Sequence, residues 1–158
     1  MRKALVTTLI FGMILSAHAL LPQAVSTSTR FGKLEVNRGG ILVFKDIPVE
    51  PKIQVNTRID LGTPFQIGDS DIVLVIDEGG TACPFQYHFV TLNRSGAHAT
   101  KAFGTCNEAT SIKRDGDSII VRMRGYRGPF EPQAERQRAT EERHTFAFHD
   151  GTVKEIGH

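Results

Sequence analysis

The sequence lacks the short motifs that mark the common catalytic and cofactor-binding classes. It contains no Gly-x-Ser-x-Gly elbow, no His-Glu-x-x-His pair, no phosphate-binding loop and no dinucleotide fingerprint. Its histidines are scattered, without the His-x-His or His/Cys spacing of a metal site. The sequence therefore predicts no catalytic residue, no metal ligand and no cofactor.

A surplus of charge is also missing once the N-terminus is set aside. The full chain has 19 Lys and Arg against 17 Asp and Glu. The signal peptide predicted below would remove Arg2 and Lys3 and no acidic residue, which leaves 17 of each sign. Nucleic-acid binding relies on a basic surplus that releases counterions. No nucleic-acid partner is predicted, although a local basic patch is compatible with a net charge of zero.

Long apolar runs are absent except at the N-terminus. Residues 4–15 are almost wholly apolar, follow Arg2 and Lys3, and precede the small-x-small pattern Ala17-His18-Ala19. This order is typical of a secretory signal that is cut after Ala19. The run is shorter than the roughly 20 residues that a spanning helix needs, and no later stretch is long enough. The sequence predicts a signal peptide over 1–19, a periplasmic or secreted location, and no integral membrane segment after cleavage.

Cysteine is scarce, with only Cys83 and Cys106 in the chain. In an exported protein, two cysteines indicate one disulfide. The bridge would close a loop of 24 residues, both ends counted, which the chain-entropy model rates at roughly 3 to 3.5 kcal/mol. A catalytic thiol is the rival interpretation, but no neighbouring residue favours it.

What the chain does have, from residue 31 onward, is a hydrophobic period of two. Residues 52–60 alternate without a fault, which predicts a strand with one wet face. Residues 72–76 are apolar on both parities, which predicts a central strand covered on both sides. Residues 85–92 predict a further strand whose aromatic residues share one face.

Turn signals separate these strands at fairly regular intervals. Asp115-Gly116 and Asp150-Gly151 predict hairpins with type I′ turns, which need a positive φ. The predicted fold class is all-β, an antiparallel sandwich or barrel of about ten short strands with one disulfide. Its expected organisation is the signal peptide over 1–19, a flexible mature N-terminus over 20–30 and a single β-domain over 31–158.

Residues 133–143 are the exception to the β pattern. They contain helix formers after Pro132, which suits a first helical turn, but only Ala134 and Ala139 offer contact to a core. The segment is predicted to be a solvated helical turn or a mobile excursion that the fold does not need. Tyr126 and Phe130 lie beside it as tethers or as anchors for a partner.

The cysteine motifs carry a resemblance. GGTACP at 79–84, FVT at 89–91 and FGTC at 103–106 resemble a group of small exported proteins of Gram-negative bacteria that has no assigned activity. The likeness covers roughly 71–125, about a third of the chain. It implies a periplasmic location and a disulfide, and it supplies no catalytic residue.

Together these features favour a non-enzymatic β-domain that binds a partner macromolecule. An envelope or secreted protein is the expected partner, and an inhibitor or immunity-type role suits the size. Tyr126 and Phe130 are the predicted partner-binding residues. Two alternatives stay open: a small envelope hydrolase with a site assembled from residues distant in sequence, and a carrier of an apolar ligand inside a barrel.

Overall fold

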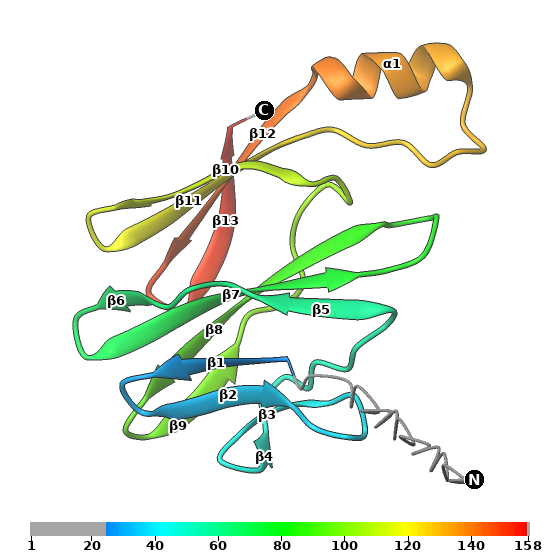
Figure 1. Cartoon of the computed structure of the whole chain (residues 1–158). Coiled ribbons are helices and arrows are strands. Elements are labelled where there is room, and N and C mark those ends of the chain that lie inside the picture. Colours follow the sequence, from blue (N-terminus) through cyan, green and yellow to red (C-terminus); the bar gives the residue numbers. More distant parts are fainter. Residues whose placement is uncertain (1–24, 158) are drawn as a thin grey trace, which may run out of the picture.

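The computed structural model describes residues 25–157, which form thirteen strands and one helix arranged as three stacked antiparallel sheets (Figure 1). The first sheet contains β1 (Ser26–Thr29), β2 (Gly32–Val36), β3 (Leu42–Phe44) and β4 (Ile47–Pro48). The middle sheet contains β5 (Arg58–Leu61), β6 (Phe65–Ile67), β7 (Ser70–Glu78), β8 (Phe85–Asn93) and β9 (Gly96–Ala99). The third sheet contains β10 (Ala109–Asp115), β11 (Ser118–Arg124), β12 (Arg143–His149) and β13 (Thr152–Gly157), and α1 (Gln133–Glu141) lies between β11 and β12.

Strand β7 runs through the centre of the molecule and is buried on both faces. Val73 and Val75 pack into one apolar cluster with side chains of the first sheet, while Ile72 and Leu74 pack into a second cluster with side chains of the third sheet. The prediction of a doubly covered central strand over 72–76 is confirmed. The all-β prediction is confirmed as well, and the sheets of the described residues stack without closing into a barrel.

Two predicted hairpin turns differ in outcome. Asp150 and Gly151 both have positive φ, 47° and 71°, and connect β12 to β13 as a type I′ turn would. At the other hairpin, Asp115 pairs with Ser118, so the loop residues are Gly116 and Asp117 and not Asp115 and Gly116. Only Gly116 has a positive φ there, 58°, which is the pattern of a type II′ turn with glycine in the first central position.

The strand predicted over 52–60 was wrong for most of its length, because β5 begins only at Arg58. Before it the chain crosses from the first sheet to the middle sheet, and only Gln54 makes an isolated bridge, to Ile41. Ile53 is nevertheless buried in the first cluster, and its carbonyl accepts a hydrogen bond from the Leu42 amide. The alternation reflects burial along an irregular crossover.

The predicted flexible N-terminus over 20–30 needs correction at residues 26–30. Strand β1 pairs along its whole length with β2. Arg30 then binds Asp71, with the Arg30 amide donating to Oδ2 at 2.6 Å and Nε donating to Oδ1 at 2.7 Å. Asp71 is only 1% exposed, and a carboxylate so deeply buried needs such a partner. Residues 20–24 and the predicted signal peptide over 1–19 lie outside the described residues.

Helix α1 has neither the length nor the apolar content of a membrane-spanning helix, and it is the one helix within residues 25–157. Ala139 is its only buried residue. Figure 1 shows α1 and the loop before it standing away from the sheets. The predicted helical alternative for residues 133–143 is therefore the one that the structure adopts over Gln133–Glu141.

Candidate functional site

One end of the molecule is organised around the predicted disulfide. Cys83, in the turn between β7 and β8, is bonded to Cys106, in the loop before β10, with a Cα–Cα distance of 4.7 Å. The prediction of this bridge is confirmed. The turn is tight: a Cβ on Gly79 would lie 2.5 Å from the Cys83 carbonyl oxygen. Glycine is required here because the opposing atom belongs to the backbone.

Tyr87 of β8 contacts the loop that contains Cys106 and so supports the disulfide end of the molecule. Its ring is fully buried, and its hydroxyl accepts a hydrogen bond from the Ala109 amide and donates one to the Asn107 carbonyl. Burial raises the pKa of Tyr87 to about 12, with a smaller lowering from the Ala109 hydrogen bond and a further raising by Glu108. The sequence placed Tyr87 on an aromatic face but did not reveal this role, although a buried tyrosine hydroxyl usually finds a polar partner.

Residues 125–142, which we call the excursion, leave the third sheet beside the disulfide. Tyr126 donates its hydroxyl hydrogen bond to the Thr81 carbonyl at 2.7 Å, and Asn107 Nδ2 donates to the Gly125 carbonyl at 3.1 Å. The first residues of the excursion are thus tied to the two loops that the disulfide joins. The tethering role predicted for Tyr126 is what these contacts provide.

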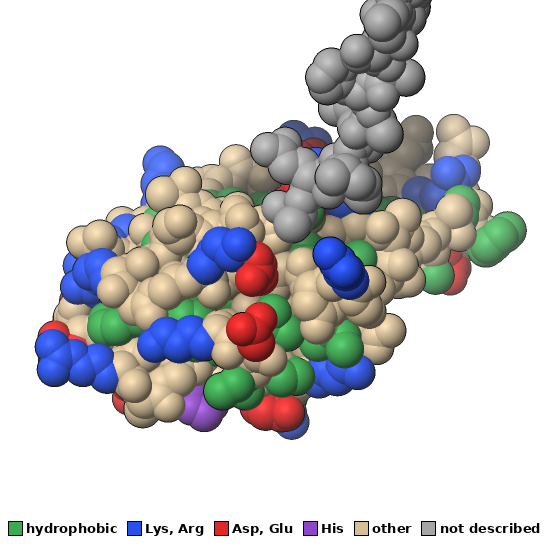
Figure 2. All heavy atoms as spheres, turned by 60° about the horizontal axis from the view of Figure 1, so that its bottom comes forward, with side chains coloured by type: hydrophobic (Ala, Val, Ile, Leu, Met, Phe, Trp, Pro, Cys, Tyr) green, Lys and Arg blue, Asp and Glu red, His purple; other side chains and the backbone are tan. Residues whose placement is uncertain are grey.

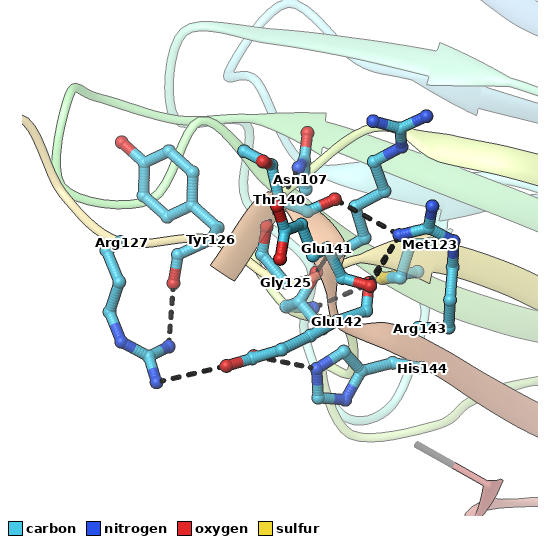
Figure 3. A network of polar contacts seen from close by, with 12 residues as sticks. Asn107, Met123, Gly125, Tyr126, Arg127, Thr140, Glu141, Glu142, Arg143 and His144 are labelled. Atoms are coloured by element: carbon cyan, nitrogen blue, oxygen red, sulfur yellow. Dashed lines mark hydrogen bonds and ion pairs between the residues drawn. The ribbon is translucent and has the colours of Figure 1, made fainter. Parts of the chain in front are cut away.

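The far end of the excursion returns to the same place (Figure 3). The Gly125 amide donates to the Glu142 carbonyl at 3.4 Å. A Cβ on Gly125 would lie 2.5 Å from Glu142 Oε2 and 2.6 Å from the Ala139 carbonyl oxygen. Arg143 closes the helix by donating from Nη1 to the carbonyls of three successive residues, Thr140, Glu141 and Glu142. The excursion is therefore held at both ends.

A row of charged side chains joins the excursion to β12 and β13. His144 Nδ1 lies 2.7 Å from Glu155 Oε1, and His144 Nε2 lies 3.4 Å from Glu142 Oε2. Arg127 Nη2 lies 4.0 Å from Glu142 Oε1. These groups are partly exposed, and such pairs contribute about 0–1 kcal/mol each. No set of three His, Cys, Asp or Glu side chains within residues 25–157 is arranged to hold a metal ion.

Phe130 occupies the tip of the loop between β11 and α1. The Glu131 amide donates to the Gly128 carbonyl at 3.1 Å, and this turn leaves Phe130 96% exposed. It is the most exposed of the large apolar side chains in the described part of the chain. Tyr126 and Phe130 belong to the same loop but differ in state, since Tyr126 is partly buried and engaged by Thr81.

A hollow also lies away from the excursion, beside the turns that contain Arg30 and Arg94. It has a volume of about 720 Å³ and includes Asp69, Ser70 and Ser95 but no histidine in its lining. The Ser95 hydroxyl donates its hydrogen bond to Asn93 Oδ1, two residues away, at 2.6 Å. These polar groups therefore do not form the nucleophile and base pair that a hydrolase site needs.

The comparisons with known proteins add no relative. No family model matches the chain, and neither the curated proteins nor the solved structures gave a significant match.

Proposed function

We propose that this chain is an exported, non-enzymatic β-protein that binds an envelope or secreted protein through its excursion, with Phe130 as the apolar anchor. The observation that carries the proposal is the 96% exposure of Phe130 on a loop that is fastened at both ends. Scattered exposed apolar residues are ordinary, but Phe130 lies in the loop before α1, and this loop and α1 stand away from the sheets (Figure 1).

Burial of Phe130 in a partner would supply the energetic centre of an interface. Removing such a side chain from water contributes roughly 1.5–3 kcal/mol, and aromatic residues are enriched at interface centres. The tether from Tyr126 to Thr81 and the contact of Gly125 with Glu142 reduce the conformational freedom that binding would otherwise remove. In this proposal Tyr126 acts indirectly, by holding the loop.

In the proposed interface, the polar residues of α1 form the solvent-exposed rim around Phe130. Glu135, Arg136, Arg138 and Glu141 are exposed, so the helix presents both signs of charge. A mixed rim favours a partner with complementary charges and contributes more to orientation and association rate than to affinity. The partner is therefore expected to present an apolar pocket surrounded by both acidic and basic residues.

The test is a photo-crosslink from position 130 in the native envelope. The exported chain carries a photoreactive phenylalanine analogue in place of Phe130, and a second chain carries it in place of Ile47, which is 69% exposed on β4. A single defined adduct from position 130, absent from position 47, is the expected result. The partner identified from that adduct is then purified and titrated against the wild-type chain.

Phe130→Ala should weaken that purified complex at least about tenfold, which corresponds to about 1.4 kcal/mol, while the melting temperature stays unchanged. Ile47→Ala is the matched control and should bind like wild type. Equal binding by Phe130→Ala and wild type, or identical adducts from both positions, would contradict the proposal.

A further inference from the structure

The outer side of the third sheet carries a concentration of basic side chains. Five residues of β11 and β12 point into the core: Ile119, Val121, Met123, Phe146 and Phe148. Because side chains alternate along a strand, Arg122 and Arg124 of β11 and Arg143 of β12 point the other way. The register sets Lys113 opposite Ile120 and Lys154 opposite Ala147 on the same outer side. We call these five residues the basic face: Lys113, Arg122, Arg124, Arg143 and Lys154.

Four of the five side chains of the basic face have no partner within the described residues, and the fifth, Arg143, donates to the carbonyls at the end of α1. Lys113, Arg122, Arg124 and Lys154 make no side-chain hydrogen bond and no ion pair with any residue of 25–157. Arg124 also stands directly opposite Arg143, and like charges directly opposite each other destabilise a sheet. The fold thus keeps an unfavourable arrangement that an anionic ligand would relieve.

Acidic residues lie at both ends of this surface. Asp115, Asp117 and Asp150 are in or beside the hairpin turns, at the end of the strands away from Arg122, Arg124 and Arg143. At the arginine end, Glu108 precedes β10 and Glu142 precedes β12, and Glu142 is already engaged by Arg127 and His144. The side of the molecule that carries the first sheet is different. There, basic and acidic side chains lie next to each other (Figure 2), as in the ion pair of Lys33 with Glu35.

The shape of the basic face restricts the class of ligand. The hollow described above is lined by other residues. The basic face spreads over the four strands of the third sheet, and no other sheet of residues 25–157 covers that side (Figure 1). It carries no aromatic side chain on which the bases of a single-stranded nucleic acid would stack. It also lacks the aromatic anchor typical of protein interfaces. An extended array of negative charge, attracting several basic residues at once, fits it best.

We propose that the basic face docks the protein on an anionic lipid bilayer by attracting the headgroup phosphates. Each Lys or Arg near such a surface strengthens binding on the order of fivefold, and the attraction decays within a Debye length of about 10 Å at 0.1 M salt. The proposal does not depend on Phe130 or on the identity of a protein partner. In this arrangement the third sheet faces the membrane surface, and the excursion stays accessible to a protein partner.

The test is sedimentation with lipid vesicles, using exported chain whose N-terminus has been sequenced, since a retained apolar segment would bind lipid by itself. Wild type should bind vesicles of mixed phosphatidylcholine and phosphatidylglycerol, and should not bind vesicles of phosphatidylcholine alone. Raising the salt toward 1 M, where the Debye length falls to about 3 Å, should release it.

The decisive variants change the same charge on opposite sides of the molecule. Arg122→Ala with Arg124→Ala should weaken vesicle binding by about 25-fold, from about fivefold for each residue. Neither side chain has an intramolecular partner, so the melting temperature should hold. Arg38→Ala with Arg94→Ala removes the same charge from the β2–β3 and β8–β9 turns and should leave binding unchanged.

Several results would overturn the proposal. One is equal binding of wild type to anionic and neutral vesicles. Another is equal loss of binding in the two double variants. Loss of binding in Phe130→Ala would assign lipid attachment to the excursion instead. Binding to polyglutamate or to duplex DNA without binding to anionic vesicles would assign the basic face to another class of macromolecule.

Discussion

The β7 strand and the excursion are held in place by different kinds of interaction. Strand β7 is fixed by burial, with Val73 and Leu74 no more than 2% exposed and two apolar clusters against its faces. The excursion has one buried residue, Ala139, and is positioned by hydrogen bonds and partly exposed charges. Changes in the first region should alter stability, and changes in the second should alter position and binding.

The two faces of β7 also differ from each other. The cluster toward the first sheet is mainly aliphatic, while the cluster toward the third sheet contains Tyr87, Phe89, Phe146 and Phe148. Phe89 and Phe148 have ring centroids 4.7 Å apart, a distance at which aromatic pairs contribute about 0.5–1.5 kcal/mol beyond area burial. The aromatic cluster includes Tyr87, which binds the loop next to Cys106, so this cluster supports the disulfide end of the molecule.

The largest effect is expected for Leu74→Ala. This change leaves a cavity between the middle and third sheets, where the surrounding strands leave little room for collapse, and should cost roughly 2–5 kcal/mol in unfolding free energy. Urea unfolding monitored by circular dichroism measures it. Ile47→Ala, at a site 69% exposed, should cost under about half a kcal/mol. Equal costs for the two variants would mean that β7 is not the buried centre.

Removal of the disulfide ranks next. Replacing Cys83 and Cys106 together by serine should cost roughly 2–5 kcal/mol, as for other small disulfide-bonded domains. The turn that carries Thr81 should loosen, and with it the tether from Tyr126. Trypsin should then cut faster at Arg136 and Arg138 than in wild type. Unchanged proteolysis together with lowered stability would show that the disulfide stabilises the fold but does not hold the excursion in place.

A pH dependence is expected at the alkaline end from Tyr87. Its folded pKa of about 12 lies above the ordinary value of 10.0, so the folded state holds its proton more tightly than the unfolded state. This contribution to stability is fully present below pH 10 and is lost as the pH rises from about 10 to about 12. Urea unfolding across that range should show a smaller decline in Tyr87→Phe. An identical decline in both proteins would exclude Tyr87 as the cause.

A smaller effect on stability is expected for Gly125→Ala. The new methyl group would collide with the Ala139 carbonyl and with Glu142, so the end of α1 must move outward, at a cost of about 1–2 kcal/mol. Faster tryptic cleavage of α1 measures the displacement. Gly128→Ala is the matched control in the same loop, because nothing lies within 4 Å of its Cβ position. Similar cleavage rates in both variants would contradict the described contact.

Local signals were sufficient to predict much of the fold. The apolar run over 72–76 indicated burial on both faces, Asp150-Gly151 indicated its turn, and the cysteine pair indicated the disulfide. Each of these inferences depends on neighbouring residues or on a residue type with few possible roles. The strand predicted before β5 was wrong, because the burial of residues along an irregular crossover produced the same alternating pattern that a strand would give.

Features that need long-range register could not be predicted from the sequence. Asp71 lies in β7 and binds Arg30, 41 positions earlier in the chain, and no local pattern indicates such a pair. The basic face depends on the pairing of β10 through β13, and the near balance of 19 basic against 17 acidic residues in the sequence conceals it. Tyr126 and Phe130 were predicted as tethers or partner anchors beside residues 133–143, and only the structure distinguishes the exposed Phe130 ring from the Tyr126 tether.

The most direct test of the central claim is the affinity of the crosslinked and purified partner for a chain whose residues 127–141 are replaced by a short Gly/Ser linker. This change removes Phe130 and α1 and leaves the three sheets and the disulfide intact. We expect a folded protein that no longer binds the partner. Retained binding at wild-type affinity would contradict it, because recognition would then belong to the sheets.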